Sequence, residues 1–128
     1  MADERVPVLS PVAKERGSGL ALNVNADLAA AALAGRLRAA KLVYLSDVLG
    51  VMRDPEDSST LIPSIPSEEV GGLIDRGVIT GGMIPKLRSS VEALQAGVGK
   101  VHMIDGRISH SLLLEIFTDT GIGSEVIL

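Results

Sequence analysis

The chain has 128 residues, of which 46% are hydrophobic, and its net charge at pH 7 is −4. This composition favours one domain with a core large enough to fold without staples. The absence of cysteine excludes disulfides, thiolate metal sites and cysteine nucleophiles. The acidic balance and the presence of only two aromatic residues argue against nucleic-acid binding. No apolar run reaches the roughly 18 residues of a membrane span, and the first residues lack the apolar core of a signal peptide, so we expect a cytoplasmic protein without membrane contact.

The first part of the chain predicts a strand, a helix and a second strand. Residues 6–9 are apolar and precede a Ser-Pro pair, which is typical of a short buried strand. After a polar loop, a helix begins at Asn25 or Asp27 and runs to about residue 40. The apolar run over residues 42–45 predicts a strand covered on both faces. Four apolar residues at helical spacing are expected to face the core: Leu28, Ala32, Leu33 and Leu37.

The rest of the chain predicts three helices and two strands. After a charged loop, Ser67 caps a helix that ends before Gly77. Another helix begins after Gly81 and Gly82 and ends at Gly97. The inner stripes of these two helices are expected to be Val70, Leu73, Ile74, Leu87, Val91 and Leu94. A strand over residues 101–104, a helix over about 109–117 and a last strand over 124–128 follow.

Strands alternate with helices along almost the whole chain, which predicts an α/β fold with a mainly parallel sheet and helices on both faces. Ligands of such sheets bind beyond the carboxyl ends of the strands. The loops that begin at Ser46, Gly81 and Asp105 are therefore the places where we expect a site.

Two amides and a carboxylate open the first predicted helix, in the run from Asn23 through Asn25 to Asp27. Amide side chains can orient a small polar ligand, and the carboxylate of Asp27 can pair with a cation. The alternative is that Asn25 or Asp27 only caps the helix.

The run from Ser46 to Met52 leaves a predicted buried strand. Asp47 can hold a ribose hydroxyl, a magnesium-bound water or a loop amide, and Gly50 can let the backbone approach a ligand closely. The alternative is an Asx-turn followed by a glycine bend.

The run from Gly81 to Lys86 is the most informative part of the sequence. Two glycines precede a helix start, where backbone N–H groups suit phosphate. Lys86 stands in the first turn, where the helix dipole disfavours a cation, which indicates a negative partner nearby. The run is not a Walker A loop. The alternative is a surface lysine on an ordinary helix.

The two histidines and the Asp105-Gly106-Arg107 run carry weaker signals. His102 and His110 have no second histidine at metal-ligand spacing, so we predict no metal site. Arg107 is expected to pair locally or to reach an anionic ligand.

Together and in this order, these motifs resemble the C-terminal half of the N-acetylglutamate kinases, a branch of the amino-acid kinase family. The resemblance runs from the Val6–Pro11 segment to the Gly121–Ser124 segment. It implies the fold of that half and a part in transferring a phosphoryl group from Mg-ATP to the side-chain carboxylate of N-acetyl-L-glutamate, in arginine biosynthesis.

The resemblance also implies roles for single residues. Lys86 and Asp27 would be catalytic, the lysine steadying the transferring phosphoryl group and the aspartate organising lysines around it. Asn23 and Asn25 would contact the acetylglutamate. The nucleotide would be bound by Ser46, Asp47, Gly50, Val51, Met52, Gly81, Gly82 and Met83. No direct protein ligand to magnesium is expected.

None of the motifs that the family carries in its N-terminal half occurs here. We therefore expect residues 1–128 to be one ATP-binding domain without the acceptor-binding domain and with little or no activity by itself. Two alternatives stay open: another amino-acid kinase, such as one acting on an aminoadipate derivative, or a non-catalytic module that binds a nucleotide or arginine.

The end of the chain resembles the arginine-sensitive members of the family. The resemblance implies that L-arginine inhibits the intact enzyme from a site near His110, Glu115, Gly121 and Gly123. The alternative is that residues 109–117 form a packing helix capped by serine. A sheet without its other half would expose a strand edge, so we also expect a homo-oligomer.

Overall fold

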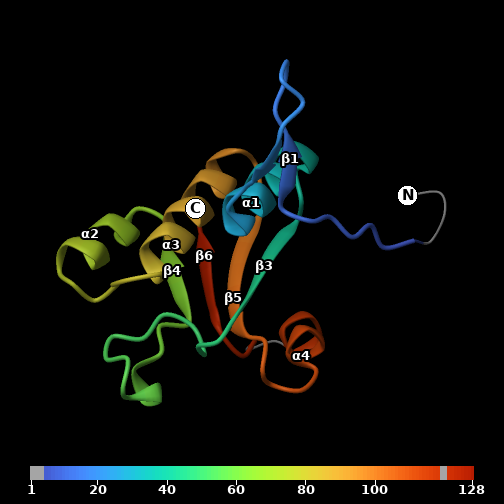
Figure 1. Ribbon diagram of the computed structural model, residues 1–128. Coiled ribbons are helices and arrows are strands. Elements are labelled where there is room, and N and C mark those ends of the chain that lie inside the picture. Colours follow the sequence, from blue (N-terminus) through green and yellow to red (C-terminus); the bar gives the residue numbers. More distant parts are fainter. Residues whose placement is uncertain (1–4, 119–120) are drawn as a thin grey trace.

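The computed structural model describes residues 5–118 and 121–128. It contains four α-helices, a four-stranded sheet against which they pack, and a small two-stranded sheet that extends away from the rest (Figure 1). In chain order the elements are β1 (Val12–Lys14), β2 (Ala21–Asn23), α1 (Ala26–Leu37), β3 (Lys41–Ser46), a 3-10 turn (Ser58–Thr60), β4 (Ser64–Pro66), α2 (Glu69–Asp75), α3 (Met83–Gln95), β5 (Lys100–Asp105), α4 (Ser111–Phe117) and β6 (Ser124–Ile127).

The larger sheet has the strand order β3-β5-β6-β4. β3 runs parallel to β5, with Tyr44 opposite Met103, and β4 runs parallel to β6. The two halves meet at an antiparallel pairing of β5 with β6, where Met103 lies opposite Ser124. The predicted mainly parallel sheet is therefore confirmed, with one antiparallel junction that the sequence pattern did not indicate.

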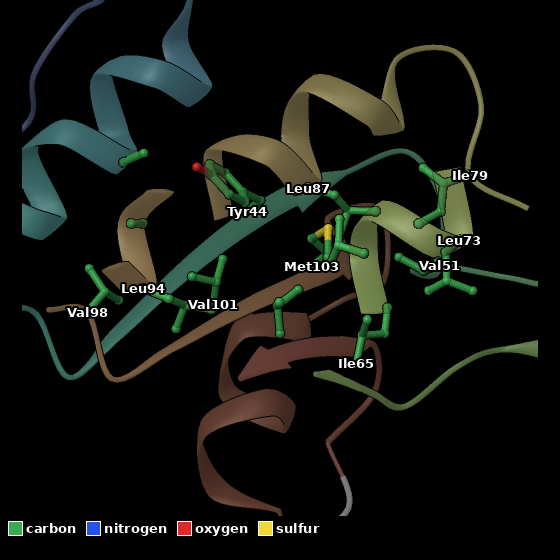
Figure 2. Close-up of a cluster of buried hydrophobic side chains, with 14 of the residues drawn as sticks. Tyr44, Val51, Ile65, Leu73, Ile79, Leu87, Leu94, Val98, Val101 and Met103 are labelled. Atoms are coloured by element: carbon green, nitrogen blue, oxygen red, sulfur yellow. The ribbon is translucent and has the colours of Figure 1, made fainter. Parts of the chain in front are cut away.

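Helices cover both faces of this sheet, as predicted. Tyr44 on β3 contacts α1 and α3, whereas His102 on β5 contacts Glu115 of α4. His102 and Met103 are neighbours on one strand, so their side chains point to opposite faces. Figure 2 accordingly shows α1 and α3 above the strands and α4 below them. The hydrophobic core lies between the sheet and α1, α2 and α3, around Leu87, Leu94, Val101 and Met103.

The predicted strand at residues 6–9 is wrong. Val6 is 87% exposed and Val8 is 92% exposed, and the segment belongs to neither sheet. A run of four apolar residues forms a strand only where a neighbouring strand accepts its hydrogen bonds, and Pro7 supplies no N–H for such a pairing. The hairpin of β1 and β2, with Ala13 opposite Leu22, was missed.

The predicted inner face of α1 is also wrong. Leu28, Leu33 and Leu37 are 49%, 42% and 70% exposed, and Ala32 is exposed as well. The buried positions are Ala31, Ala34 and Gly35. A Cβ at Gly35 would lie 2.7 Å from the Cβ of Ala96, so α1 approaches the end of α3 too closely for larger side chains.

Other elements lie close to where the sequence placed them. The predicted stripes of α2 and α3 are buried at Val70, Leu73, Leu87 and Leu94. The strand at residues 42–45 is only partly covered, because Leu45 is 58% exposed at the sheet edge. The short strand β4 was missed.

Two predicted caps differ from the structure. α2 follows Glu68 rather than Ser67, without a side-chain capping bond. α4 follows His110, which has φ +60°, rather than a serine. In the part of the chain that the structure describes, no helix has the length and apolar character needed to cross a membrane. Homo-oligomer formation stays a prediction.

Candidate functional site

A cavity of about 590 Å³ lies beyond the carboxyl end of β3. Its walls come from the loop after β3, from the segment between α2 and α3, and from the first turn of α3. The structure brings nine of the predicted site residues to it: Asp27, Ser46, Asp47, Gly50, Val51, Met52, Gly82, Met83 and Lys86. The cavity is thus at the edge of the sheet where ligands of α/β folds bind.

Lys86 and Asp27 form an ion pair at this cavity. The Nζ atom of Lys86 lies 2.8 Å from the Oδ2 atom of Asp27, and the side chains are 15% and 31% exposed. The two residues are far apart in sequence and meet because α1 packs against α3. Asp27 is therefore a negative partner of the kind that the position of Lys86 indicated, and it offsets the unfavourable helix dipole.

Tyr44 lies beneath this ion pair, and its hydroxyl donates to the backbone carbonyl of Asp27 at 3.1 Å. The Lys86 ammonium lies 4.8 Å from the centre of the Tyr44 ring. Burial raises the pKa of the Tyr44 hydroxyl above its usual range, against a smaller lowering by the hydrogen bond with Ser89. Tyr44 therefore carries its proton at neutral pH.

Two backbone N–H groups at the start of α3 are already used within the turn. The N–H groups of Met83 and Ile84 donate to the carbonyls of Thr80 and Gly81 at 3.2 and 3.3 Å. Gly81 has φ +55°, does not line the cavity and serves the turn into the helix. Lys86 and Gly82 both line the cavity, and Lys86 brings a positive charge to this end of it.

Close packing leaves no room for a side chain at position 50. A Cβ at this position would lie 2.6 Å from the Oγ atom of Ser124 and 3.0 Å from its backbone nitrogen. The same Ser124 Oγ accepts a hydrogen bond from the N–H of Val51 at 2.9 Å. The loop after β3 is thereby fixed to β6, which holds one wall of the cavity in place.

The two residues predicted to contact the acetylglutamate lie outside the cavity. Asn23 is exposed at the end of β2, where it pairs with Val12. Asn25 is exposed, and its Oδ1 atom accepts the N–H of Leu28 at 3.1 Å, so it caps α1. Asn25 therefore caps α1, and contact of Asn23 and Asn25 with the acetylglutamate stays a prediction.

Several wall residues were not predicted from the sequence: Leu45, Pro55, Val78, Ile79 and Thr80. Val78 to Thr80 join α2 to α3, and they carry no polar motif that would mark a site. The signal that could have found them is their place immediately before the Gly81-Gly82 turn.

A second, smaller hollow of about 190 Å³ lies between β5, β6 and the loop after α4. Of the four predicted regulatory residues, Glu115, Gly121 and Gly123 line it, whereas His110 does not. His102 lines it instead. Its Nδ1 atom contacts the Glu115 carboxylate, and its buried Nε2 atom has no hydrogen-bond partner within residues 5–118 and 121–128.

Charged neighbours complete this hollow. Lys100 donates to Glu125 at 2.9 Å, which holds the pKa of the Glu125 carboxyl below its usual range. A Cβ on Gly121 would lie 2.9 Å from the Glu115 carboxylate. His102 was missed as a member of this group because its partner lies on another element.

Within the Asp105-Gly106-Arg107 run, the arginine pairs with the aspartate. The Nη2 and Nε atoms of Arg107 donate to the Asp105 carboxylate at 2.8 and 2.9 Å, which holds the pKa of that carboxyl below its usual range. The local alternative for Arg107 is therefore confirmed. Across the described residues, no group of three or more acidic or histidine side chains is arranged to hold a metal ion.

The structure thus defines an α/β domain with a lysine–aspartate pair at a cavity beyond its sheet. The sequence pattern described as the amino acid kinase family matches residues 1–105, and the chain belongs to this family. An acetylglutamate kinase from Akkermansia muciniphila is 60% identical over 121 residues, which are 94% of this chain and 41% of that protein. The chain therefore spans less than half the length of this curated relative.

Solved structures show the same fold. N-acetylglutamate synthase from Neisseria gonorrhoeae, complexed with coenzyme A and L-arginine, matches 93% of this chain and 27% of its own with a TM-score of 0.83 and 33% identity. Carbamate kinase from Giardia lamblia bound to AMP-PNP matches 91% of this chain and 36% of its own, with a TM-score of 0.67 and 25% identity.

Proposed function

We propose that this chain is the ATP-binding part of an acetylglutamate kinase. The whole protein would transfer the γ-phosphoryl group of ATP to the side-chain carboxylate of N-acetyl-L-glutamate, a step of arginine biosynthesis. The observation that carries the proposal is the Lys86–Asp27 pair at the cavity beyond β3. The curated relatives named acetylglutamate kinase and the AMP-PNP complex of carbamate kinase support it.

The residues around the cavity fit a nucleotide with its magnesium ion. The apolar walls at Val51, Val78 and Ile79 suit a purine ring, and Lys86 suits the phosphates. Magnesium usually keeps several waters and takes one or two carboxylates in addition to substrate phosphates. Asp47 lines the cavity with an exposed side chain, so it would hold a magnesium-bound water rather than the ion itself.

The chemistry needs positioning and charge neutralisation more than covalent participation. A carboxylate oxygen of N-acetyl-L-glutamate forms a bond to the γ-phosphorus, and the bond from that phosphorus to the β,γ-bridging oxygen breaks, so that ADP leaves and an acyl phosphate forms. Lys86 would steady the negative charge on the transferring group, because its ammonium is already held at the cavity. Asp27 would keep the lysine oriented.

The acceptor side of this reaction is not complete in the described residues. Asn23 and Asn25, which would contact the acetylglutamate, are exposed and lie outside the cavity. We therefore expect the chain by itself to bind Mg-ATP and to transfer little phosphate. An ADP-release assay with acetylglutamate should give no more than background turnover.

The first experiment is a calorimetric titration of the chain with Mg·AMP-PNP. We expect saturable binding that Lys86→Ala weakens about tenfold or more, since the phosphates lose their cation. Arg88→Ala is the matched control, because it removes the same charge from an exposed position on α3 that does not line the cavity. Its affinity should stay within about twofold of the original.

Two results would overturn the proposal: no saturable binding by the unmodified chain, or an equal loss in the Lys86→Ala and Arg88→Ala variants. Circular dichroism of each variant separates lost binding from lost folding. Aminoadipate derivatives, tested as acceptors after the missing part is supplied in trans, separate this assignment from another amino-acid kinase.

A second proposal concerns the hollow beside α4. We infer that it binds L-arginine and that this binding would inhibit the whole enzyme. The carboxylates of Glu115 and Glu125 and the unpartnered Nε2 atom of His102 line a space of about 190 Å³. Carboxylates are the usual partners of a guanidinium group. The synthase from Neisseria gonorrhoeae was solved with L-arginine, which supports this candidate.

Titration with L-arginine tests the regulatory site separately. Glu125→Gln should lower the affinity about tenfold, because a charge-assisted pair becomes neutral. Glu92→Gln, an exposed change on α3, should leave it unchanged. L-lysine should compete poorly, since it lacks the planar fork of donors. Absence of arginine binding would rule out a site in this chain alone, and full activity of the whole enzyme in saturating arginine would rule out inhibition.

A further inference from the structure

Tyr44 touches both members of the ion pair at the cavity. It is the only tyrosine of the chain, lies on β3, and is 5% exposed. Figure 2 shows it on the face of the sheet that α1 and α3 cover, with its hydroxyl directed toward the helices. The hydroxyl lies 3.1 Å from the backbone carbonyl of Asp27 and 3.1 Å from the Oγ atom of Ser89, so it connects α1 with α3.

The ring of Tyr44 supports the other side of the pair. Lys86 Nζ lies 4.8 Å from the ring centre and 2.8 Å from the Asp27 carboxylate. An ammonium within about 6 Å of a ring centre is attracted by the negative face of the ring, more strongly where water is partly excluded. Lys86 is only 15% exposed, so both contacts act in a partly desolvated place.

We propose that Tyr44 is a positioning residue for Lys86: its ring seats the ammonium at the cavity, and its hydroxyl fixes the two helices that carry Asp27 and Lys86. This inference rests on the proposed nucleotide site. A lysine side chain has four rotatable bonds and normally loses much freedom when it contacts a ligand. An ammonium that is already held in place loses less conformational freedom on binding, which favours binding of an anion in the cavity.

The ion pair leaves Lys86 able to contact a phosphate. An ammonium group has three N–H donors, and the Asp27 carboxylate accepts one of them. The ring attracts the positive charge of the ammonium but accepts no conventional hydrogen bond from it. The lysine therefore keeps donors for a phosphate oxygen while its position is fixed.

Two neighbouring serines allow a matched comparison. Ser89 and Ser90 are both fully buried, and each hydroxyl oxygen lies 2.8 Å from the Lys86 carbonyl oxygen. Only Ser89 also contacts the Tyr44 hydroxyl. Ser89→Ala and Ser90→Ala thus remove the same group from the same helix, but only Ser89→Ala removes a contact of the tyrosine hydroxyl.

The first test measures the ligand-free chain by NMR. The ε-methylene protons of Lys86, assigned with Lys86→Arg, should be shifted upfield by the ring relative to those of exposed Lys14. Tyr44→Leu should abolish this shift, and Tyr44→Phe should reduce it, because the ring stays but loses its hydroxyl contacts. Ser89→Ala should reduce the shift less than Tyr44→Phe does and more than Ser90→Ala does. An unshifted Lys86 resonance in the unmodified chain would overturn the proposal without any nucleotide, even if Tyr44→Leu fails to fold.

The second test compares two ligands. Tyr44→Leu should weaken Mg·AMP-PNP binding about tenfold, whereas Tyr44→Phe should stay within about threefold of the original. Adenosine binding should change in neither variant, because adenosine has no phosphate for Lys86 to contact. Equal losses for both ligands would mean that Tyr44 only supports folding. If the unmodified chain binds no AMP-PNP, the proposed function fails, and the NMR shift alone still decides the role of Tyr44.

Discussion

Replacing Gly123 with alanine should lower the free energy of unfolding by about 3–5 kcal/mol, because nothing at this position can move aside. A Cβ there would lie 2.1 Å from the Met103 carbonyl oxygen and 3.1 Å from the Ile104 Cα. Both are backbone atoms of β5, so relief requires β6 to separate from β5 where Met103 pairs with Ser124. The effect reaches the cavity, since Ser124 holds Val51 through its Oγ atom.

Urea unfolding followed by circular dichroism measures this change. Gly71→Ala is the matched control: it lies inside α2, and a Cβ there meets no atom within 4 Å. Because alanine is the better helix former, this variant should be about 0.5–1 kcal/mol more stable than the original. A Gly123→Ala variant with unchanged stability would mean that β6 does not pair with β5 as described.

The sequence predicted best those parts that are decided by local rules. The glycines before and after α3, the apolar stripe with Leu87 and Leu94, and the position of Lys86 against the helix dipole are all readable over a few residues. The same holds for the alternation of strands and helices, which gave the fold class. The position of Lys86 also predicted a negative partner, and Asp27 is such a partner.

The parts that were not predictable depend on contacts between distant segments. The leucines of α1 suggested an inner face, but the close approach of Gly35 to Ala96 selects the small residues instead. Gly50 was predicted to lie near a ligand, and the sequence did not show that it also packs against Ser124, far along the chain. A single sequence shows which residues are small or apolar and leaves open which other segment they meet.

The histidine at the second hollow illustrates the same limit. His110 stood next to the motif and was predicted, whereas His102, eight residues earlier on a strand, makes the contact with Glu115. Strand β5 and helix α4 face each other across a turn, so His102 contacts a residue 13 positions later in the chain. The stability of that contact can be measured.

Glu115→Ala should cost about 2–4 kcal/mol, because the carboxylate contacts both the buried His102 ring and the partly buried N–H of Ile122. Its Oε1 atom contacts His102, and its Oε2 atom accepts the N–H of Ile122 at 2.8 Å. Both side chains of the His102–Glu115 pair are 6% exposed, so water does not easily replace the lost group. The loop with Gly121 would lose its anchor on α4.

Urea unfolding of three variants separates the contributions. Glu115→Gln keeps an acceptor for Ile122 or His102 and should lose about half as much stability as Glu115→Ala. Glu92→Ala removes an exposed carboxylate from α3 and should change the stability by less than about 0.5 kcal/mol. If Glu115→Ala behaved like Glu92→Ala, the carboxylate would not hold the loop after α4. The urea titration shows whether Glu115→Ala is folded, and the calorimetric titration shows whether it binds L-arginine. If the variant is less stable but folded and does not bind L-arginine, the loss of binding can be assigned to the site.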